Sequence, residues 1–179
     1  MRIKDTANGY GWASIALHWV VAGLVIAQYI ISGDMEGGSE ASERAATGLH
    51  ISIGLIAFSF IIVRVFWRVR SGEKPLPPAN IILAFLSRWV PRLLLITTAV
   101  LVISGPLMVW SKGYDLHMFD WLTIPTPMSK IEWLHEALEE VHEIAGIIIF
   151  NLVVLHILGG LKHLIFNRDG VFQRMISPK

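Results

Sequence analysis

The chain has no cysteine among its 179 residues. Disulfide bonds and metal sites built on thiolates are therefore excluded. Charged side chains are also scarce, at 16%, whereas apolar residues make up 54% and the mean hydropathy is +0.57. So little polar surface could not cover a water-soluble domain of this length. The net charge is only +1, and no nucleic-acid partner is expected.

The apolar residues are gathered in runs about as long as a bilayer is thick. A spanning helix needs ~20 mostly apolar residues, and four segments qualify, at about 12–31, 45–63, 93–110 and 144–161. They predict a single all-α integral membrane domain over 1–179, a bundle of four transmembrane helices. A fifth stretch, Ala79 to Val90, is short and interrupted by Arg88, so we expect an interfacial lead-in to the third span. The first run is too long for a signal peptide, and no small-residue cleavage site follows it.

Basic and acidic residues fall on different connections. Twelve of the 15 Lys and Arg residues lie in the N-terminus, the second connection and the C-terminus, whereas the first and third connections carry three basic and eleven acidic residues. By the positive-inside rule, both termini are expected to be cytoplasmic. Membrane lipid is thus the protein's first expected partner.

The connections carry further local signals. The stretch 71–78, with E-K-P-L-P-P, predicts a stiff cytoplasmic turn, and 32–44 predicts a short outer loop. The third connection, 111–143, is expected to begin as a loop. Ser129 with Glu132 three residues later predicts that the fourth helix starts near Ser129 or Lys130 with a capping box.

Four of the seven histidines lie in or at the edge of the spans, where ionisable side chains are usually functional. His142 and His156 are 14 residues apart, which is ~21 Å of helical rise with the two side chains within ~40° of each other. The predicted directions of the helices put His50 at the outer level with His142, and His18 at the inner level with His156. Two facing histidine pairs inside a bundle are what bis-histidine haem iron requires, and without cysteine the two haems must be non-covalent, of b type.

Small residues support this assignment. A haem lies flat against the helix that carries its ligand, so the residue four positions on should be small. This holds for all four proposed ligands and for none of the other histidines; the small residues are Ala22, Gly54, Gly146 and Gly160.

Alternatives remain for several residues. A zinc or copper site is disfavoured because the two pairs differ in depth and lack a nearby carboxylate, although a metal transporter stays possible. His135 shares the face of His142, but ~31 Å of rise would separate it from His156, so we expect a surface histidine, or else a proton-handling or gating residue. Arg64 either snorkels to the interface or pairs with a propionate of the inner haem.

The motifs resemble those of the bacterial cytochrome b561 family, the small four-helix di-haem membrane cytochromes. They are L-H-W at His18, L-H-I-S-I-G at His50, R-V-F-W-R at Arg64, V-H-E-I-A-G with a second His 14 residues later, and the ending R-D-G-V-F-Q-R-M. The resemblance implies that His18, His50, His142 and His156 are the axial ligands. It also implies a link to the quinone pool and, for the closest members, superoxide oxidation at the outer face with ubiquinone as acceptor.

The leading hypothesis is therefore electron transfer across the membrane between an outer-face donor and quinone, either as a superoxide:ubiquinone oxidoreductase or as a pure electron carrier. The acidic outer connections would repel superoxide unless Lys112 or Lys130 forms a local positive funnel, and they suit a cationic redox protein at least as well. Two alternatives are a membrane-anchor subunit of a dehydrogenase or hydrogenase, and a haem-free helical transporter or scaffold.

Overall fold

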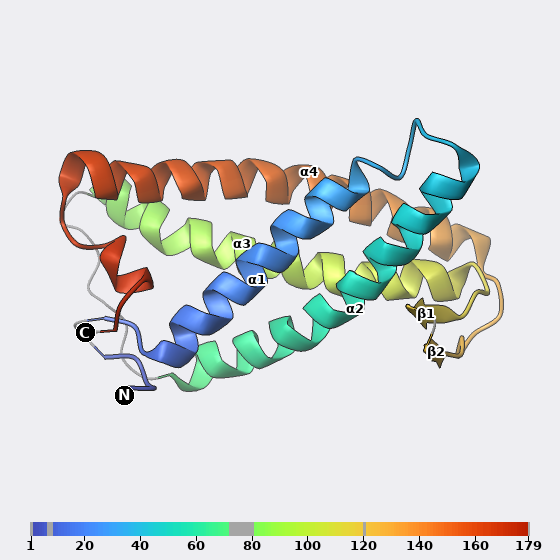
Figure 1. Ribbon diagram of the computed structural model, residues 1–179, viewed down its shortest axis with the longest axis horizontal. Helices are drawn as coiled ribbons and strands as arrows, with labels where there is room; N and C mark the ends of the chain where they lie inside the picture. Colours follow the sequence, from blue (N-terminus) through green and yellow to red (C-terminus); the bar gives the residue numbers. More distant parts are fainter. Residues whose placement is uncertain (1, 7–8, 72–80, 120, 179) are drawn as a thin grey trace.

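The computed structural model describes residues 2–6, 9–71, 81–119 and 121–178. Its main elements are the long helices α1 (Trp12–Ser32), α2 (Glu40–Arg70), α3 (Ile81–Ser111) and α4 (Glu132–Lys162). The helices run up and down in turn, so both termini lie at one end of the bundle (Figure 1). All four are long and apolar enough to cross a membrane. The predicted all-α fold with four spans is confirmed.

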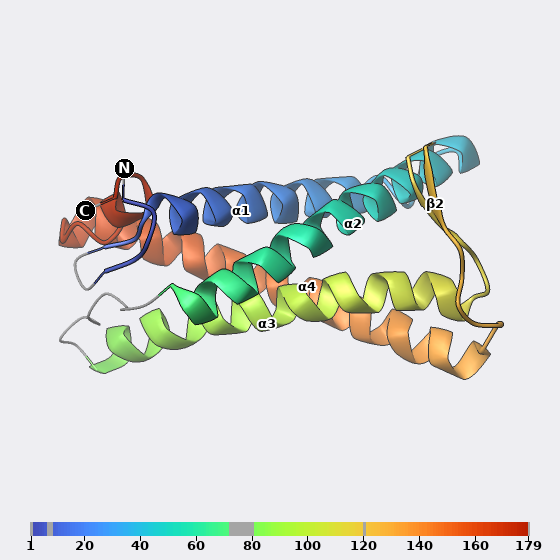
Figure 2. The same cartoon turned by 90° about the horizontal axis from the view of Figure 1, so that it is seen from below.

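The helices do not approach one another equally. The backbone of α1 packs against α2, α2 against α3, and α3 against α4 along much of its length, whereas α4 hardly approaches α1 or α2. In Figure 2, α1 lies on one side of the bundle and α3 on the other. Helix α2 crosses from the side of α1 to that of α3, and α4 crosses from beside α3 at the hairpin end toward α1 at the end with the termini. The region between α4 and the first two helices is therefore bridged by side chains rather than closed by backbone packing.

Helix α2 extends beyond the apolar run at both ends. It begins at Glu40, where the side chain of Ser39 accepts a hydrogen bond from the Ser42 amide at 3.3 Å. Such a cap satisfies one of the amides that a helix start leaves unpaired. The outer connection is consequently shorter than the predicted 32–44 loop.

The predicted start of the fourth helix is wrong. Helix α4 begins at Glu132 after Ile131, with no side-chain cap. The Ile131 amide donates to the Ser111 carbonyl at 2.8 Å, and this tertiary contact keeps the chain extended past Ser129. Glu132 pairs with Lys130 instead of closing a capping box.

Helix α3 includes the stretch that was predicted as an interfacial lead-in. From Ile81 onward this stretch is continuous with the third span, and both Pro91 and Pro106 lie inside the helix. A proline removes one backbone hydrogen bond, which transmembrane helices tolerate when neighbouring groups satisfy the freed carbonyl. The predicted stiff turn with E-K-P-L-P-P falls on 72–80, outside the described residues.

The third connection contains a small antiparallel hairpin instead of the expected loop. Its strands are β1 (Leu116–Met118) and β2 (Leu122–Ile124), with Leu116 opposite Ile124. Leu116 is buried, and the Phe119 amide donates to Ser52 Oγ of α2 at 2.8 Å. The hairpin is thereby fixed to α2 two residues from His50, at the end of the bundle opposite the termini (Figure 1).

Candidate functional site

The histidine pair nearer the termini, which the sequence predicts to be the inner pair, joins α1 to α4. The rings of His18 and His156 have centroids 6.0 Å apart and are inclined at 65°. Arg64 of α2 places its Nη2 3.3 Å from His18 Nδ1. All three side chains are half-buried.

The outer histidine pair joins α2 to α4. The rings of His50 and His142 have centroids 6.2 Å apart and are inclined at 73°. Both histidine pairings that the sequence predicts are therefore adjacent in the structure, and they come from the helices that approach each other least. Their role as haem ligands stays a prediction.

The ring separations fit coordination of one metal ion by each pair. Two imidazoles that bind one iron from opposite sides have centroids about 6 Å apart, because each nitrogen lies ~2.0–2.1 Å from the metal and about 1.1 Å from its own ring centre. The separations of 6.0 and 6.2 Å in the structure agree with this value. Among the described residues no group of three or more His, Cys, Asp or Glu side chains could hold a metal ion, so a tetrahedral zinc site finds no support there.

Helix periodicity explains how α4 and α2 each contribute side chains to both histidine pairs. His142 and His156 lie on one face of α4, 14 residues apart, and contribute one ring to each pair. The same spacing recurs in α2 between His50 and Arg64. Fourteen residues correspond to ~21 Å of rise on nearly the same face, so α2 presents a histidine to the outer pair and a cation to the inner pair.

Helix α3 supplies two contacts to His142 that the sequence analysis missed. Ser104 Oγ lies 2.9 Å from His142 Nδ1, and its hydroxyl also reaches the Leu101 carbonyl at 3.3 Å. A Cβ on the neighbouring Gly105 would lie 3.4 Å from His142 Cε1. A hydrogen bond at Nδ1 fixes the ring orientation and leaves Nε2 for a ligand. The signal in the sequence was the S-G pair inside an apolar span, since small residues mark close helix contacts.

The other outer ring, His50, is held through its backbone. Gln28 of α1 donates to the His50 carbonyl at 3.1 Å. His50 Nδ1 is buried without a hydrogen-bond partner among the described residues. Buried ring nitrogens usually have a hydrogen-bond partner. The unpartnered edge of the His50 ring therefore marks a position inside the bundle where a bound group could make a contact.

The four small residues have different surroundings. A Cβ on Gly146 would meet nothing within 4 Å, which leaves open space one turn from His142. A Cβ on Gly54 would lie 3.0 Å from Gln28 Nε2, and one on Gly160 would lie 3.6 Å from the Phe172 ring. Ala22 is half-buried on α1. Gly146 is therefore the clearest candidate for contact with a flat group, and the haem-facing role of the other three stays a prediction.

The expectation that His135 is a surface residue is wrong. The residue is 7% exposed, and its Nδ1 lies 3.0 Å from the Met108 carbonyl. That carbonyl belongs to the last turn of α3, where backbone acceptors lack helical partners, and Ser111 Oγ also donates to it. His135 thus joins the outer ends of α3 and α4. Its ring is not part of either facing pair.

The remaining two histidines lie outside the bundle interior. Exposed His117 contacts Thr123 within the hairpin at 3.0 Å. His163 begins the π-helical turn His163–Asn167 after α4, and its Nδ1 lies 2.7 Å from Asp169 Oδ2. The chain then folds back, and Trp19 Nε1 of α1 donates to the Met175 carbonyl at 2.7 Å. This C-terminal segment, 168–178, covers the inner ends of α1 and α4.

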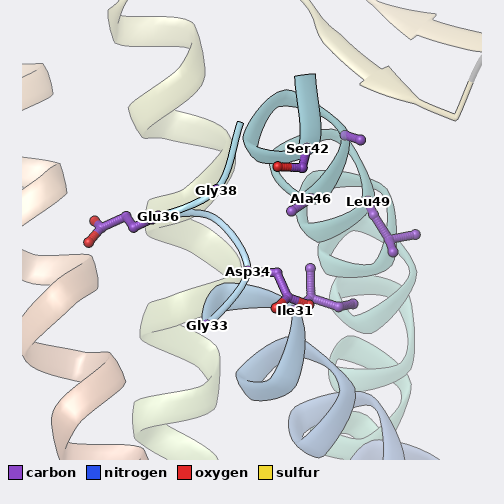
Figure 3. Close-up of a pocket in the computed structure, with 10 residues that line it drawn as sticks. Ile31, Gly33, Asp34, Glu36, Gly38, Ser42, Ala46 and Leu49 are labelled. Carbon is purple, nitrogen blue, oxygen red and sulfur yellow. The ribbon is translucent and has the colours of Figure 1, made fainter. Parts of the chain in front are cut away.

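A separate hollow of 510 Å³ opens between the first connection and the start of α2. Figure 3 shows Asp34 and Glu36 on the connection and Ser42 on the helix. No histidine lines this hollow. It is therefore distinct from the two histidine pairs.

Known proteins are similar to this chain over nearly its whole length. The family model of the prokaryotic cytochrome b561 matches residues 9–178. Cytochrome b561 homolog 2 of Escherichia coli (strain K12) is 26% identical over 99% of this chain and 96% of its own. Cytochrome b562 of Cereibacter sphaeroides is 28% identical over 96% of this chain and 97% of its own. With four spanning helices and a family model that covers almost all of it, the chain belongs to the prokaryotic cytochrome b561 family of membrane electron-transfer cytochromes, which implies b-type haem.

Proposed function

We propose that this chain holds two b-type haems and carries electrons between the outer face of the cytoplasmic membrane and the quinone pool. His50 and His142 would ligate the outer haem, and His18 and His156 the inner one. The observation that carries the proposal is the separation of the rings, 6.0 and 6.2 Å, between helices whose backbones stay apart.

The protein's own residues would hold and orient the cofactors. When bound, haem iron exchanges single electrons. Ser104 orients His142 through Nδ1, and Gly146 leaves room beside it. Arg64 would pair with an inner propionate, since a guanidinium is the preferred partner of a carboxylate in a half-buried position.

The charge of the outer end bears on the electron donor. Lys130, one of the two lysines that could attract superoxide, is paired with Glu132. The hydrogen bond that Lys130 donates to the Glu132 carboxylate, together with the negative charge of that carboxylate, raises the pKa of Lys130. The ammonium therefore stays protonated, and the pair is electrically neutral as a unit. Exposed carboxylates surround this position on α4, and we therefore favour a cationic redox protein over superoxide as donor. Ubiquinone is the proposed acceptor.

Family membership removes the haem-free transporter or scaffold from consideration. The membrane-anchor alternative differs in having a permanent soluble partner. It predicts that a dehydrogenase or hydrogenase subunit co-purifies with the chain in mild detergent, whereas the proposed carrier purifies alone.

The test is a reduced-minus-oxidised visible spectrum of the detergent-purified full chain, with pyridine haemochrome quantification. Wild type should contain two b haems per chain, and His142→Ala should reduce this number toward one. His135→Ala, on the same helix, is the matched control and should retain two. One haem or none in the wild type, or equal loss in both variants, would contradict the proposed ligand pairs.

A further inference from the structure

The two histidine pairs differ in the polar groups that touch them. The inner pair touches a guanidinium, and the outer pair touches a neutral hydroxyl. Given the proposed two-haem function, this difference bears on where a single electron settles.

At the inner pair a fixed positive charge is close to the ligand. Arg64 Nη2 lies 3.3 Å from His18 Nδ1. No carboxylate in the part of the chain that the structure describes forms an ion pair with Arg64. A nearby cation disfavours ferric iron, which carries one more positive charge than ferrous iron. Arg64 therefore raises the reduction potential of the inner site. The same holds when Arg64 is paired with a propionate, because removal of Arg64 would leave the negative charge of the propionate uncompensated.

At the outer pair the hydrogen bond acts in the opposite direction. The Ser104 hydroxyl donates to the Leu101 carbonyl at 3.3 Å, so its oxygen is free to accept the His142 Nδ1 proton at 2.9 Å. An acceptor at Nδ1 makes the ring a stronger base at its other nitrogen. A more basic ligand stabilises ferric iron and lowers the reduction potential of the outer site.

The charges at the two ends of the molecule add a weaker effect of the same sign. The end of the bundle with the termini (Figure 1) holds the last turn of α2, with Arg68 and Arg70, and the first half of α3, with Arg88 and Arg92. The first half of α4, which begins at the opposite end, carries exposed carboxylates such as Glu136, Glu139 and Glu140. Solvent screens each of these charges, but their sum attracts negative charge toward the inner end.

We propose that Arg64 and Ser104 are positioning residues that give the inner site a higher reduction potential than the outer site. An electron supplied by a one-electron reductant at the outer end then settles at the inner end. In this transfer one electron leaves the outer site and one arrives at the inner site, with no bond broken and no proton moved.

The experiment is a spectroelectrochemical titration of the haem-loaded full chain, which resolves two one-electron waves. Arg64→Gln should lower the upper wave so that the ratio of reduced to oxidised haem at a fixed potential falls about tenfold, or ~59 mV for a one-electron couple. Arg64→Lys keeps the charge and should restore the wild-type wave. Ser104→Ala should shift the lower wave to a higher potential, so that the ratio of reduced to oxidised haem at a fixed potential rises a few-fold. Ser104→Thr keeps the hydroxyl and should leave the lower wave unchanged.

The outcomes separate this inference from the proposed function. Fewer than two haems in the wild type would defeat the proposed function itself. Two results would overturn only the inference. One is two haems whose waves coincide, and the other is that Arg64→Gln shifts the lower wave instead of the upper one, or shifts the upper wave to a higher potential. If Arg64→Gln fails to retain its inner haem, Ser104→Ala decides: a rise confined to the lower wave supports the inference, and any other response overturns it.

Discussion

At the residue scale, the close approach of α3 to α4 depends on the absence of a side chain at Gly105. Its α-carbon faces the His142 ring, and even a Cβ would lie 3.4 Å from Cε1. The same turn of α3 supplies the Ser104 hydroxyl at 2.9 Å. One small residue therefore allows its neighbour to hold the ring in place.

Gly105→Leu should displace His142 and remove the outer haem. The added side-chain carbons would occupy the position of the imidazole, and overpacking of this kind typically costs ~1–3 kcal/mol. Pyridine haemochrome assay should give about half of the wild-type haem content. Gly23→Leu on α1 is the control, because a Cβ there meets nothing within 4 Å, and it should keep both haems. Full haem content in Gly105→Leu would mean that this contact does not position the ligand.

Some features of individual residues could be predicted from the sequence, and others depend on contacts between distant parts of the chain. The partners of His18, His50, His142 and His156 could be predicted, because helix direction and a 14-residue spacing fix depth and face. The burial of His135 could not, because it depends on an unpaired carbonyl at the end of another helix, that of Met108. Ser104 was missed for the same reason: its partner lies 38 residues away.

At the element scale, long apolar runs predicted the four helices, and short segments were not predictable. Hydropathy over ~20 residues is a strong signal, whereas the three-residue strands β1 and β2 have almost no periodicity to detect. The start of α4 was misplaced because the Ile131 amide is bound by the Ser111 carbonyl. In each case a contact distant in sequence overrode the local pattern.

Ser52→Ala should loosen the hairpin from α2. The mutation removes the acceptor of the part-buried Phe119 amide, and a hydrogen bond of this kind contributes ~0.5–1.5 kcal/mol. Hydrogen exchange of the Phe119 amide should therefore accelerate severalfold, up to about tenfold. Ser59→Ala is the matched control, since Ser59 bonds only to its own helix, at the Leu55 carbonyl, and exchange in the hairpin should then be unchanged. Equal effects of the two mutations would show that the Ser52 contact does not hold the hairpin.

The C-terminal segment should respond to acid through Asp169. Burial raises the pKa of Asp169, but the hydrogen bonds from His163, Val171 and Asn167 outweigh this and lower it below its usual 3.8. A carboxyl whose pKa is lowered by folding stabilises the fold above pH 3.8, and this contribution is lost as the pH falls through the lower folded value. Exchange of the Val171 amide, corrected for its intrinsic rate, should therefore be constant from neutral pH to about pH 4 and accelerate below it. Asp169→Asn should exchange fast at every pH, and acid-induced acceleration persisting in that variant would assign the effect to another group.

At the scale of the whole molecule, charge and topology agree. The structure puts both termini at one end and the hairpin at the other (Figure 1). Acidic residues dominate the hairpin end, and basic residues dominate the end with the termini. From this distribution the positive-inside rule predicts that the termini lie in the cytoplasm, and this orientation stays a prediction.

The absence of cysteine makes this orientation directly measurable. Ser177→Cys, in the exposed C-terminal segment, should react with a membrane-impermeant maleimide only in inverted membrane vesicles. Ser129→Cys, exposed beyond the hairpin, should react only in right-side-out vesicles. The unmodified chain is the control for background labelling, because it has no thiol. The reverse labelling pattern would invert the assignment of inner and outer sites.

Helix α4 provides one ring to each of the two pairs, and it is the last of the four helices to leave the ribosome. The histidines of α1 and α2 are inserted earlier in translation and have no pair partner until α4 is inserted. A chain released after α3 would span the membrane three times and complete neither pair. If the pairs bind haem as proposed, haem loading would require that α4 has been made, and chains ending before it would stay colourless.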